Sequence, residues 1–129
     1  MAAKLEHVNM TVSDPEATAQ LLCQLFDWPV RWSGPAIDGG VSFHIGEKDN
    51  YVAVYSQGGD DTIGNSYSSP GGLNHLGVVV DDLDMVEARV KEAGFITHSH
   101  ADYEPGRRFY FNDHDGIEIE VVSYSYLSG

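Results

Sequence analysis

Basic residues are scarce in this sequence. Seven lysines and arginines stand against 20 aspartates and glutamates, which gives a formal net charge of −13. A charge of this sign repels phosphate backbones and anionic lipid headgroups, so we expect neither a nucleic acid nor a membrane among the partners. It favours solubility, a cationic ligand or a metal ion.

Cysteines and long apolar runs are also missing. The single cysteine, Cys23, cannot form an internal disulfide, which is typical of a protein in a reducing compartment. No apolar run approaches the roughly 20 residues of a membrane-spanning helix, and residues 1–12 lack the basic and apolar regions of a signal peptide. We therefore predict a cytoplasmic location. With 129 residues, 42% of them hydrophobic, the chain can form one globular domain with a real core.

What the sequence does contain is a repeat. The segment from Leu5 to Asp14 resembles the segment from Leu73 to Asp82, and His7 corresponds to His75, 68 positions later. Both segments read Leu, any residue, His, and then a mostly aliphatic run that ends on an acidic residue. We interpret the chain as a single domain, 1–129, made of repeat 1 (5–56) and repeat 2 (73–124) joined by a Gly/Ser-rich linker (57–72).

Each repeat continues with one helix and three strands. Helices are predicted at 15–25 and 83–93, capped by Ser13 or Asp14 and by Asp81 or Asp82. Strands are expected at 30–33, 41–45, 51–55, 96–100, 108–111 and 117–122. The fold class is therefore α+β, with two βαβββ modules that form curved mixed sheet.

The repeat itself suggests a metal site. If the copies pack with pseudo-twofold symmetry, His7 and His75 approach each other, and neutral imidazole is a common ligand of divalent transition metals. The last strand offers Glu118 and Glu120 on one face, and spacing does not choose between them. The simpler alternatives are histidines with structural hydrogen bonds and a solvated acidic face.

The segments 7–12, 74–78 and 109–120 also resemble a known family, the vicinal-oxygen-chelate superfamily. It includes glyoxalase I, extradiol dioxygenases, fosfomycin-resistance enzymes and bleomycin-resistance proteins. The resemblance extends over 5–124 and implies a glyoxalase/dioxygenase-like fold around a central site. It departs at His114, which replaces the usual proline of the turn before the last strand. Counted from this turn, Glu120 falls at the ligand position of the family and Glu118 does not.

The resemblance implies a metal-dependent enzyme that chelates two oxygens of a small substrate at His7, His75 and Glu120. Fe²⁺ or Mn²⁺ would suit this set best, and Zn²⁺ or Ni²⁺ would also fit. The fourth ligand of glyoxalase I would fall near Ala53, which cannot bind a metal. We therefore expect dioxygenase-like or transferase-like chemistry rather than that of true glyoxalase I. Tyr110 is then a candidate hydrogen-bond donor.

Other residues allow further hypotheses. His44 on an inner strand is a candidate acid or base, and His98 and His100 are expected to share one face of their strand. Arg107 and Arg108 would hold an anionic substrate or remain solvated. The alternative function is a metal-free protein of the bleomycin-resistance type that sequesters a cationic small molecule. The resemblance also implies a homodimer, with or without exchange of modules between chains.

Overall fold

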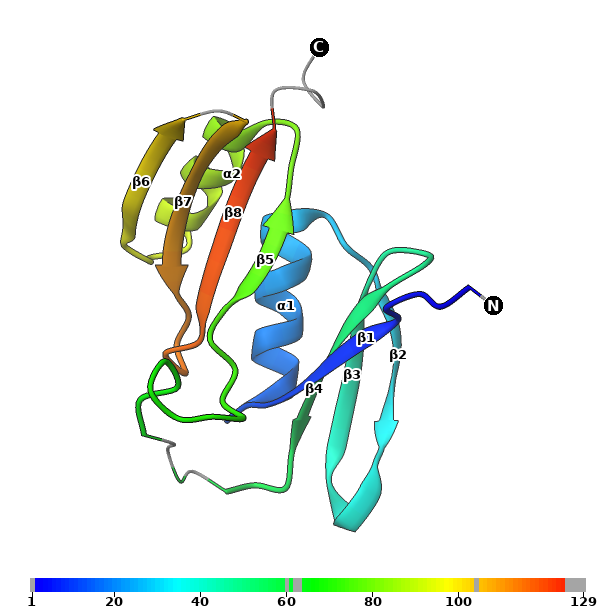
Figure 1. Cartoon of the computed structure of the whole chain (residues 1–129). Coiled ribbons are helices and arrows are strands. Elements are labelled where there is room, and N and C mark those ends of the chain that lie inside the picture. The colour runs from blue at the N-terminus through cyan, green and yellow to red at the C-terminus, as the bar shows by residue number, and fades with distance from the viewer. Residues whose placement is uncertain (1, 60, 62–63, 104, 125–129) are drawn as a thin grey trace. The chain divides into compact units, whose positions relative to one another are not determined.

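The computed structural model describes residues 2–59, 61, 64–103 and 105–124. The chain divides into two compact units, residues 1–61 and 62–129, and the boundary falls within the predicted linker. Each unit is described by itself, with its elements labelled in Figure 1. Within the described ranges, none of the helices combines the length and the apolar composition needed to cross a membrane.

Each unit contains one helix and one four-stranded mixed sheet. The strand order is β1-β4-β3-β2 in unit 1 and β5-β8-β7-β6 in unit 2, so the two units share one topology. The first strand lies parallel to the last in each sheet, and the other neighbours are antiparallel. Unit 1 comprises β1 (His7–Thr11), α1 (Pro15–Phe26), β2 (Val30–Pro35), the 3₁₀ turn η1 (Ile37–Gly39), β3 (Val41–Gly46) and β4 (Tyr51–Ser56). Unit 2 comprises β5 (Leu76–Val79), α2 (Leu83–Glu92), β6 (Thr97–Tyr103), β7 (Gly106–Asn112) and β8 (Glu118–Tyr124).

The α+β class and the two βαβββ modules are thus confirmed. The turn η1 was not predicted. It is held in place by the Tyr55 hydroxyl, which donates a hydrogen bond to the carbonyl of Ile37 at 2.6 Å. Strands β6 to β8 also reach beyond their predicted ends.

The helix ends follow local side-chain chemistry. The carboxylates of Asp14 and Asp82 each accept a hydrogen bond from the backbone N–H three residues later, at 3.1 Å. These bonds satisfy donors that the first turn leaves without a partner, and they decide between the predicted capping residues. Each helix is followed by a left-handed residue, Asp27 with φ 59° and Gly94 with φ 98°.

The core of each unit lies between its helix and one face of its sheet. Helix α1 packs on β3 and β4, and α2 packs on β6, β7 and β8. We call the other face of each sheet the open face. In unit 1 it carries His7, Asn9, Trp32, His44, Tyr51 and Ala53, and in unit 2 it carries His75, Gly77, Arg108, Tyr110, Glu118 and Glu120.

Candidate metal-binding residues

The strand registers define which positions of the two units are equivalent. Glu120 on β8 pairs with Gly77, two residues after His75. Ala53 on β4 pairs with Asn9, which is likewise two residues after His7. Ala53 is therefore the counterpart of Glu120, where the sequence placed it, and unit 1 offers no carboxylate at this position.

The two predicted catalytic residues are also counterparts of each other. Tyr110 on β7 pairs with Glu120, and His44 on β3 pairs with Ala53. Both side chains therefore lie on the open faces of their sheets. Tyr110 is on the strand next to Glu120, and His44 is on the strand next to Ala53, the counterpart of Glu120. The repeat spacing of 68 residues did not predict that His44 and Tyr110 are equivalent, because their equivalence depends on the antiparallel register of each sheet.

Both candidate histidines are oriented in the same way. The Nδ1 atom of His7 lies 2.8 Å from Oε1 of Glu6, and Nδ1 of His75 lies 2.7 Å from Oδ1 of Asn74. Carboxylate and amide oxygens only accept, so Nδ1 donates in each case and the neutral ring keeps its lone pair on Nε2. Metal-binding histidines are typically held by such a bond to the second nitrogen.

In unit 2 the Nε2 atom of His75 faces a carboxylate. It lies 3.0 Å from Oε1 of Glu120, whose side chain is only 12% exposed. Because Nδ1 of the same ring donates to Asn74, a neutral His75 directs a lone pair at another acceptor. This contact requires a proton or another cation between the two atoms, so the pair fits a metal ion.

The second oxygen of Glu120 is occupied by Arg108. The guanidinium Nη1 lies 3.0 Å from Oε2, and the Arg108 side chain is largely buried. The ring of Tyr103 lies against the same guanidinium, 5.0 Å from its central carbon. Both carboxylate oxygens of Glu120 thus have partners within unit 2.

Tyr110 lies beside this pair. Its ring meets the His75 ring edge-on, with centroids 5.8 Å apart. Burial raises the pKa of the Tyr110 phenol, and the charge of Glu120 and a hydrogen bond with that carboxylate raise it further. Tyr110 therefore keeps its proton at neutral pH and acts as a hydrogen-bond donor.

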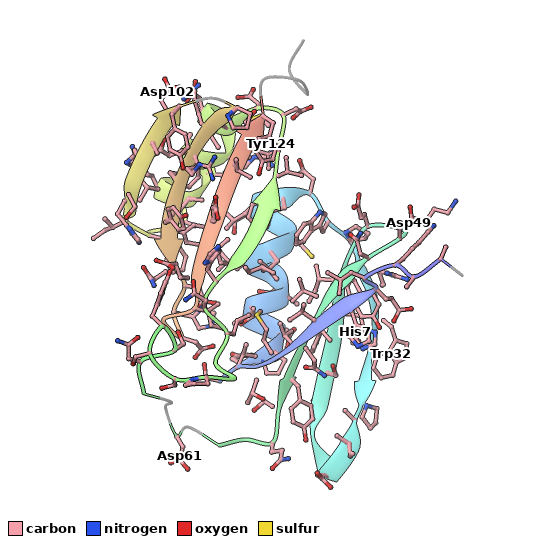
Figure 2. All side chains as sticks on the ribbon, viewed as in Figure 1. His7, Trp32, Asp49, Asp61, Asp102 and Tyr124 are labelled. Carbon is pink, nitrogen blue, oxygen red and sulfur yellow. The ribbon has the colours of Figure 1, made fainter. Side chains whose placement is uncertain are left out.

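In unit 1 the open face around His7 is mainly aromatic. Tyr51 stacks on His7 with centroids 4.8 Å apart and on His44 at 4.6 Å. Trp32 lies 5.0 Å from His44, and the guanidinium of Arg31 covers Tyr51 at 4.5 Å. Figure 2 labels His7 and Trp32 on this sheet.

The same surroundings keep His44 neutral. Burial lowers the pKa of its imidazole, and the charges of His7 and Arg31 lower it further, against a smaller opposite effect of Glu6. A neutral imidazole at physiological pH can accept a proton, as the predicted role requires.

The prediction that His98 and His100 share a face is wrong. Ser99 between them adopts φ 57°, and the register of β6 shifts at this point. As a result His98 bonds to Asn112 at 2.8 Å, whereas His100 bonds to Glu87 of α2 at 2.5 Å. The two imidazoles therefore do not form a metal pair.

The side chains of Arg107 and Arg108 also point to opposite faces of the sheet, because successive side chains alternate along β7. Arg108 reaches Glu120 on the open face, whereas Arg107 pairs with Asp84 of α2 at 2.7 Å. Sequence reasoning missed the contacts of Glu6, Asn74 and Arg108. A side-chain oxygen directly before each repeated histidine was the available signal for the first two.

The structure thus brings together His75 and Glu120 in unit 2, and His7 and His44 in unit 1. Among the described residues, no three His, Cys, Asp or Glu side chains form a complete group that could hold a metal. His7 belongs to one unit and the other two candidate ligands to the other.

Comparison with known proteins identifies one family. The model of the "Glyoxalase/Bleomycin resistance protein/Dioxygenase superfamily" matches residues 4–121. None of the curated proteins matches the sequence.

Several solved structures are similar. A glyoxylase/bleomycin resistance protein/dioxygenase domain from Frankia sp. EAN1pec has 23% identity and a TM-score of 0.79, over 96% of this chain and 99% of its own. A variant of the fosfomycin resistance protein FosX from Listeria monocytogenes, complexed with Mn(II) and a dihydroxypropylphosphonic acid, has 20% identity and a TM-score of 0.73, over 94% and 92%. The antibiotic binding protein TnmS3 from Streptomyces sp. CB03234 has 22% identity and a TM-score of 0.71, over 96% and 98%.

Proposed function

Since the chain belongs to the glyoxalase/bleomycin resistance protein/dioxygenase superfamily, we propose that it is a metal-dependent enzyme acting on a small oxygenated substrate. His7, His75 and Glu120 would bind one divalent metal, with Mn²⁺ or Fe²⁺ favoured. The Mn(II) complex of the FosX neighbour agrees with this choice of metal.

The orientation of the two histidines is the observation that carries the proposal. In both repeats the side chain of the preceding residue accepts a hydrogen bond from Nδ1, which leaves Nε2 for a metal. The contact between Nε2 of His75 and Glu120 supports the same ligand set, because it requires a cation or a proton between the two atoms.

The remaining open-face residues define what the site can do. A bound metal would supply a Lewis acid for two oxygens of the substrate. Tyr110 keeps its proton and can donate a hydrogen bond to substrate beside Glu120, while neutral His44 can accept a proton. Ala53 leaves unit 1 without the carboxylate that glyoxalase-type isomerisation uses as its base. A dioxygenase-like or transferase-like reaction is therefore favoured.

Metal analysis tests the proposal. Protein purified without an affinity tag should contain close to one equivalent of Mn or Fe per chain. Less than about 0.2 equivalents, with no Mn²⁺ uptake by the apoprotein, would contradict it. Glu120→Gln should weaken Mn²⁺ binding by about 100-fold, whereas the matched control Glu118→Gln on the same strand should change it less than about threefold.

The reaction class needs a separate assay. Oxygen uptake by the Fe²⁺-loaded protein with a panel of catechols would establish the dioxygenase form. Epoxide opening by the Mn²⁺-loaded protein would establish the transferase-like form. If neither the Fe²⁺-loaded nor the Mn²⁺-loaded protein is active in these assays, both the dioxygenase and the transferase-like reaction are excluded, but the proposed metal site is not.

The ring cluster of unit 1 favours one alternative function. Trp32 is 46% exposed beside His44, Tyr51 and Arg31, and the TnmS3 neighbour is an antibiotic binding protein. A metal-free protein that binds a cationic small molecule would use such rings. Quenching of tryptophan fluorescence by bleomycin in the presence of EDTA, lost in Trp32→Phe, would support this alternative.

We also propose a homodimer, by analogy with the two-module members of the family. We propose a small molecule as the substrate and the cytoplasm as the location. Sedimentation equilibrium should give twice the chain mass of 14.1 kDa. A monomer at micromolar concentration would contradict the homodimer.

A further inference from the structure

Arg108 occupies an unusual position for one of only seven basic residues. It lies on the open face of unit 2, and its side chain is 16% exposed. The carboxylate that neutralises it is Glu120, one of the proposed metal ligands. The metal and Arg108 would therefore share one carboxylate, with the metal on the Oε1 side that faces His75 and Arg108 at Oε2.

The hydrogen-bonding capacity of Arg108 is only partly used. Its Nη1 donates to Glu120, but its Nε is buried and has no partner among the described residues. The Tyr103 ring lies over the guanidinium, with its centroid 5.0 Å from the central carbon. A guanidinium offers five N–H donors in a fork that matches the oxygens of a carboxylate or phosphonate.

Metal binding changes the charge balance around this residue. With Glu120 free of metal, the guanidinium and the carboxylate neutralise each other. Once a divalent cation shares Glu120, one carboxylate faces both the metal and Arg108. A largely buried cation without a full counter-charge is strongly unfavourable, and an anion placed beside it restores the balance.

From this charge balance and the unpartnered Nε, and resting on the proposed metal site, we infer that Arg108 binds an oxyanion group of the substrate and that metal and oxyanion bind cooperatively. The substrate class is narrowed accordingly to small molecules that carry a carboxylate or a phosphonate beside the chelating oxygens. Arg108 is thus a specificity-determining residue. The metal would take up negative charge of Glu120 that otherwise neutralises Arg108, and the oxyanion would in turn offset the repulsion between Arg108 and the metal.

Equilibrium binding of Mn²⁺ tests this coupling without any activity assay. Free Mn²⁺ is measured by its electron paramagnetic resonance signal, with and without methylphosphonate or acetate as probes. In the wild type, at least one probe should tighten Mn²⁺ binding by about tenfold, within the usual range of coupling between two ligands. The probe with the larger effect identifies the oxyanion class.

Two substitutions of Arg108 are informative. Arg108→Met should bind Mn²⁺ about threefold or more tightly without any probe and should lose the response to both probes. Arg108→Lys keeps the charge and should retain a reduced response, so the test does not depend on the folding of one variant. The matched control Arg107→Met removes an arginine on the opposite face and should respond as the wild type does.

The outcomes separate the two proposals. Normal Mn²⁺ binding with no response to either probe, or weaker Mn²⁺ binding by Arg108→Met, would overturn the inference and leave the metal site standing. A wild-type protein that binds no Mn²⁺ would overturn the metal site, and the inference with it.

Discussion

The two open faces have the same backbone and very different side chains. In unit 1, rings of Trp32, His44 and Tyr51 stack around His7. In unit 2, the corresponding region contains the contacts of Glu120 with the imidazole of His75 and the guanidinium of Arg108. What both units retain is a histidine whose Nδ1 is bonded to the residue before it.

This difference shows how the two copies of a duplicated module can differ in function. In the proposed metal site, the repeated part would supply an oriented imidazole from each unit. The differing parts would supply a carboxylate from unit 2 and an aromatic surface from unit 1. Ala53 and Glu120 illustrate this difference. They occupy equivalent positions in the two sheets, but Ala53 offers only a methyl group whereas Glu120 offers a potential metal ligand.

The largest effect should come from the cores, which differ as well. Phe109 is fully buried in unit 2, whereas Ile45 is among the largest fully buried side chains of unit 1. Phe109→Ala should lower the free energy of unfolding by about 3–5 kcal/mol, and Ile45→Val by about 0.5–1.5 kcal/mol. Urea denaturation measures both. The control Val79→Ala, at a half-exposed position, should stay within about 0.5 kcal/mol. A loss for Phe109→Ala no larger than that of this control would contradict the role of the Phe109 ring in the core of unit 2.

A second prediction concerns the helix-covered side of unit 2. Burial by itself would raise the pKa of Glu87, but hydrogen bonds from His100 and Thr97, together with the charges of His100 and Lys91, outweigh it and lower the pKa. A depressed carboxylate pKa stabilises the fold above the ordinary value of 4.5, and this contribution is lost as the pH falls through the folded-state pKa.

The wild type should therefore lose more stability than Glu87→Gln as the pH falls from 4.5 through the lowered folded-state pKa of Glu87. Urea denaturation at a series of pH values measures the free energy of unfolding of both proteins. The difference between the two proteins at each pH isolates the contribution of Glu87 from that of the other carboxylates. Identical pH dependence of the two proteins would show that the Glu87–His100 pair does not stabilise unit 2.

The helix caps test how closely the units repeat each other. Asp14 and Asp82 make the same bond at the same distance. Asp14→Ala and Asp82→Ala should each cost about 1 kcal/mol. Thermal unfolding followed by circular dichroism measures the two losses. If the two losses differ by more than the experimental error, the two helix caps are equivalent in geometry but not in their contribution to stability.

The smallest effect is expected at Trp32, which is 46% exposed. Trp32→Phe should change the free energy of unfolding by less than about 0.5 kcal/mol. If unit 1 supplies only a surface around the site, Mn²⁺ affinity should also change less than about twofold. A large loss of Mn²⁺ affinity would mean that the rings hold His7 in place.

Much of the fold could be predicted because it depends on local patterns. The apolar periodicity and the acidic caps located both helices within a few residues. The repeat then fixed the βαβββ order. Whether Asp14 or Ser13 caps the first helix depends on which side chain reaches the first turn. The hydrogen bond from Ala17 shows that it is Asp14.

The site was harder to predict because it depends on register and on backbone exceptions. Alternation along an ideal strand placed His98 and His100 together, but the left-handed Ser99 separates them. The pairing of Arg108 with Glu120 joins residues 12 positions apart across two strands. Such contacts follow from the antiparallel register and cannot be read from spacing along one strand.

The central claim is that one metal takes an imidazole from each unit. Pulsed electron paramagnetic resonance of the Mn²⁺-loaded protein measures nitrogen couplings from bound histidines directly. The account predicts couplings from two imidazoles in the wild type and from one in both His7→Ala and His75→Ala. A spectrum without imidazole couplings, or one that His7→Ala leaves unchanged, would contradict it.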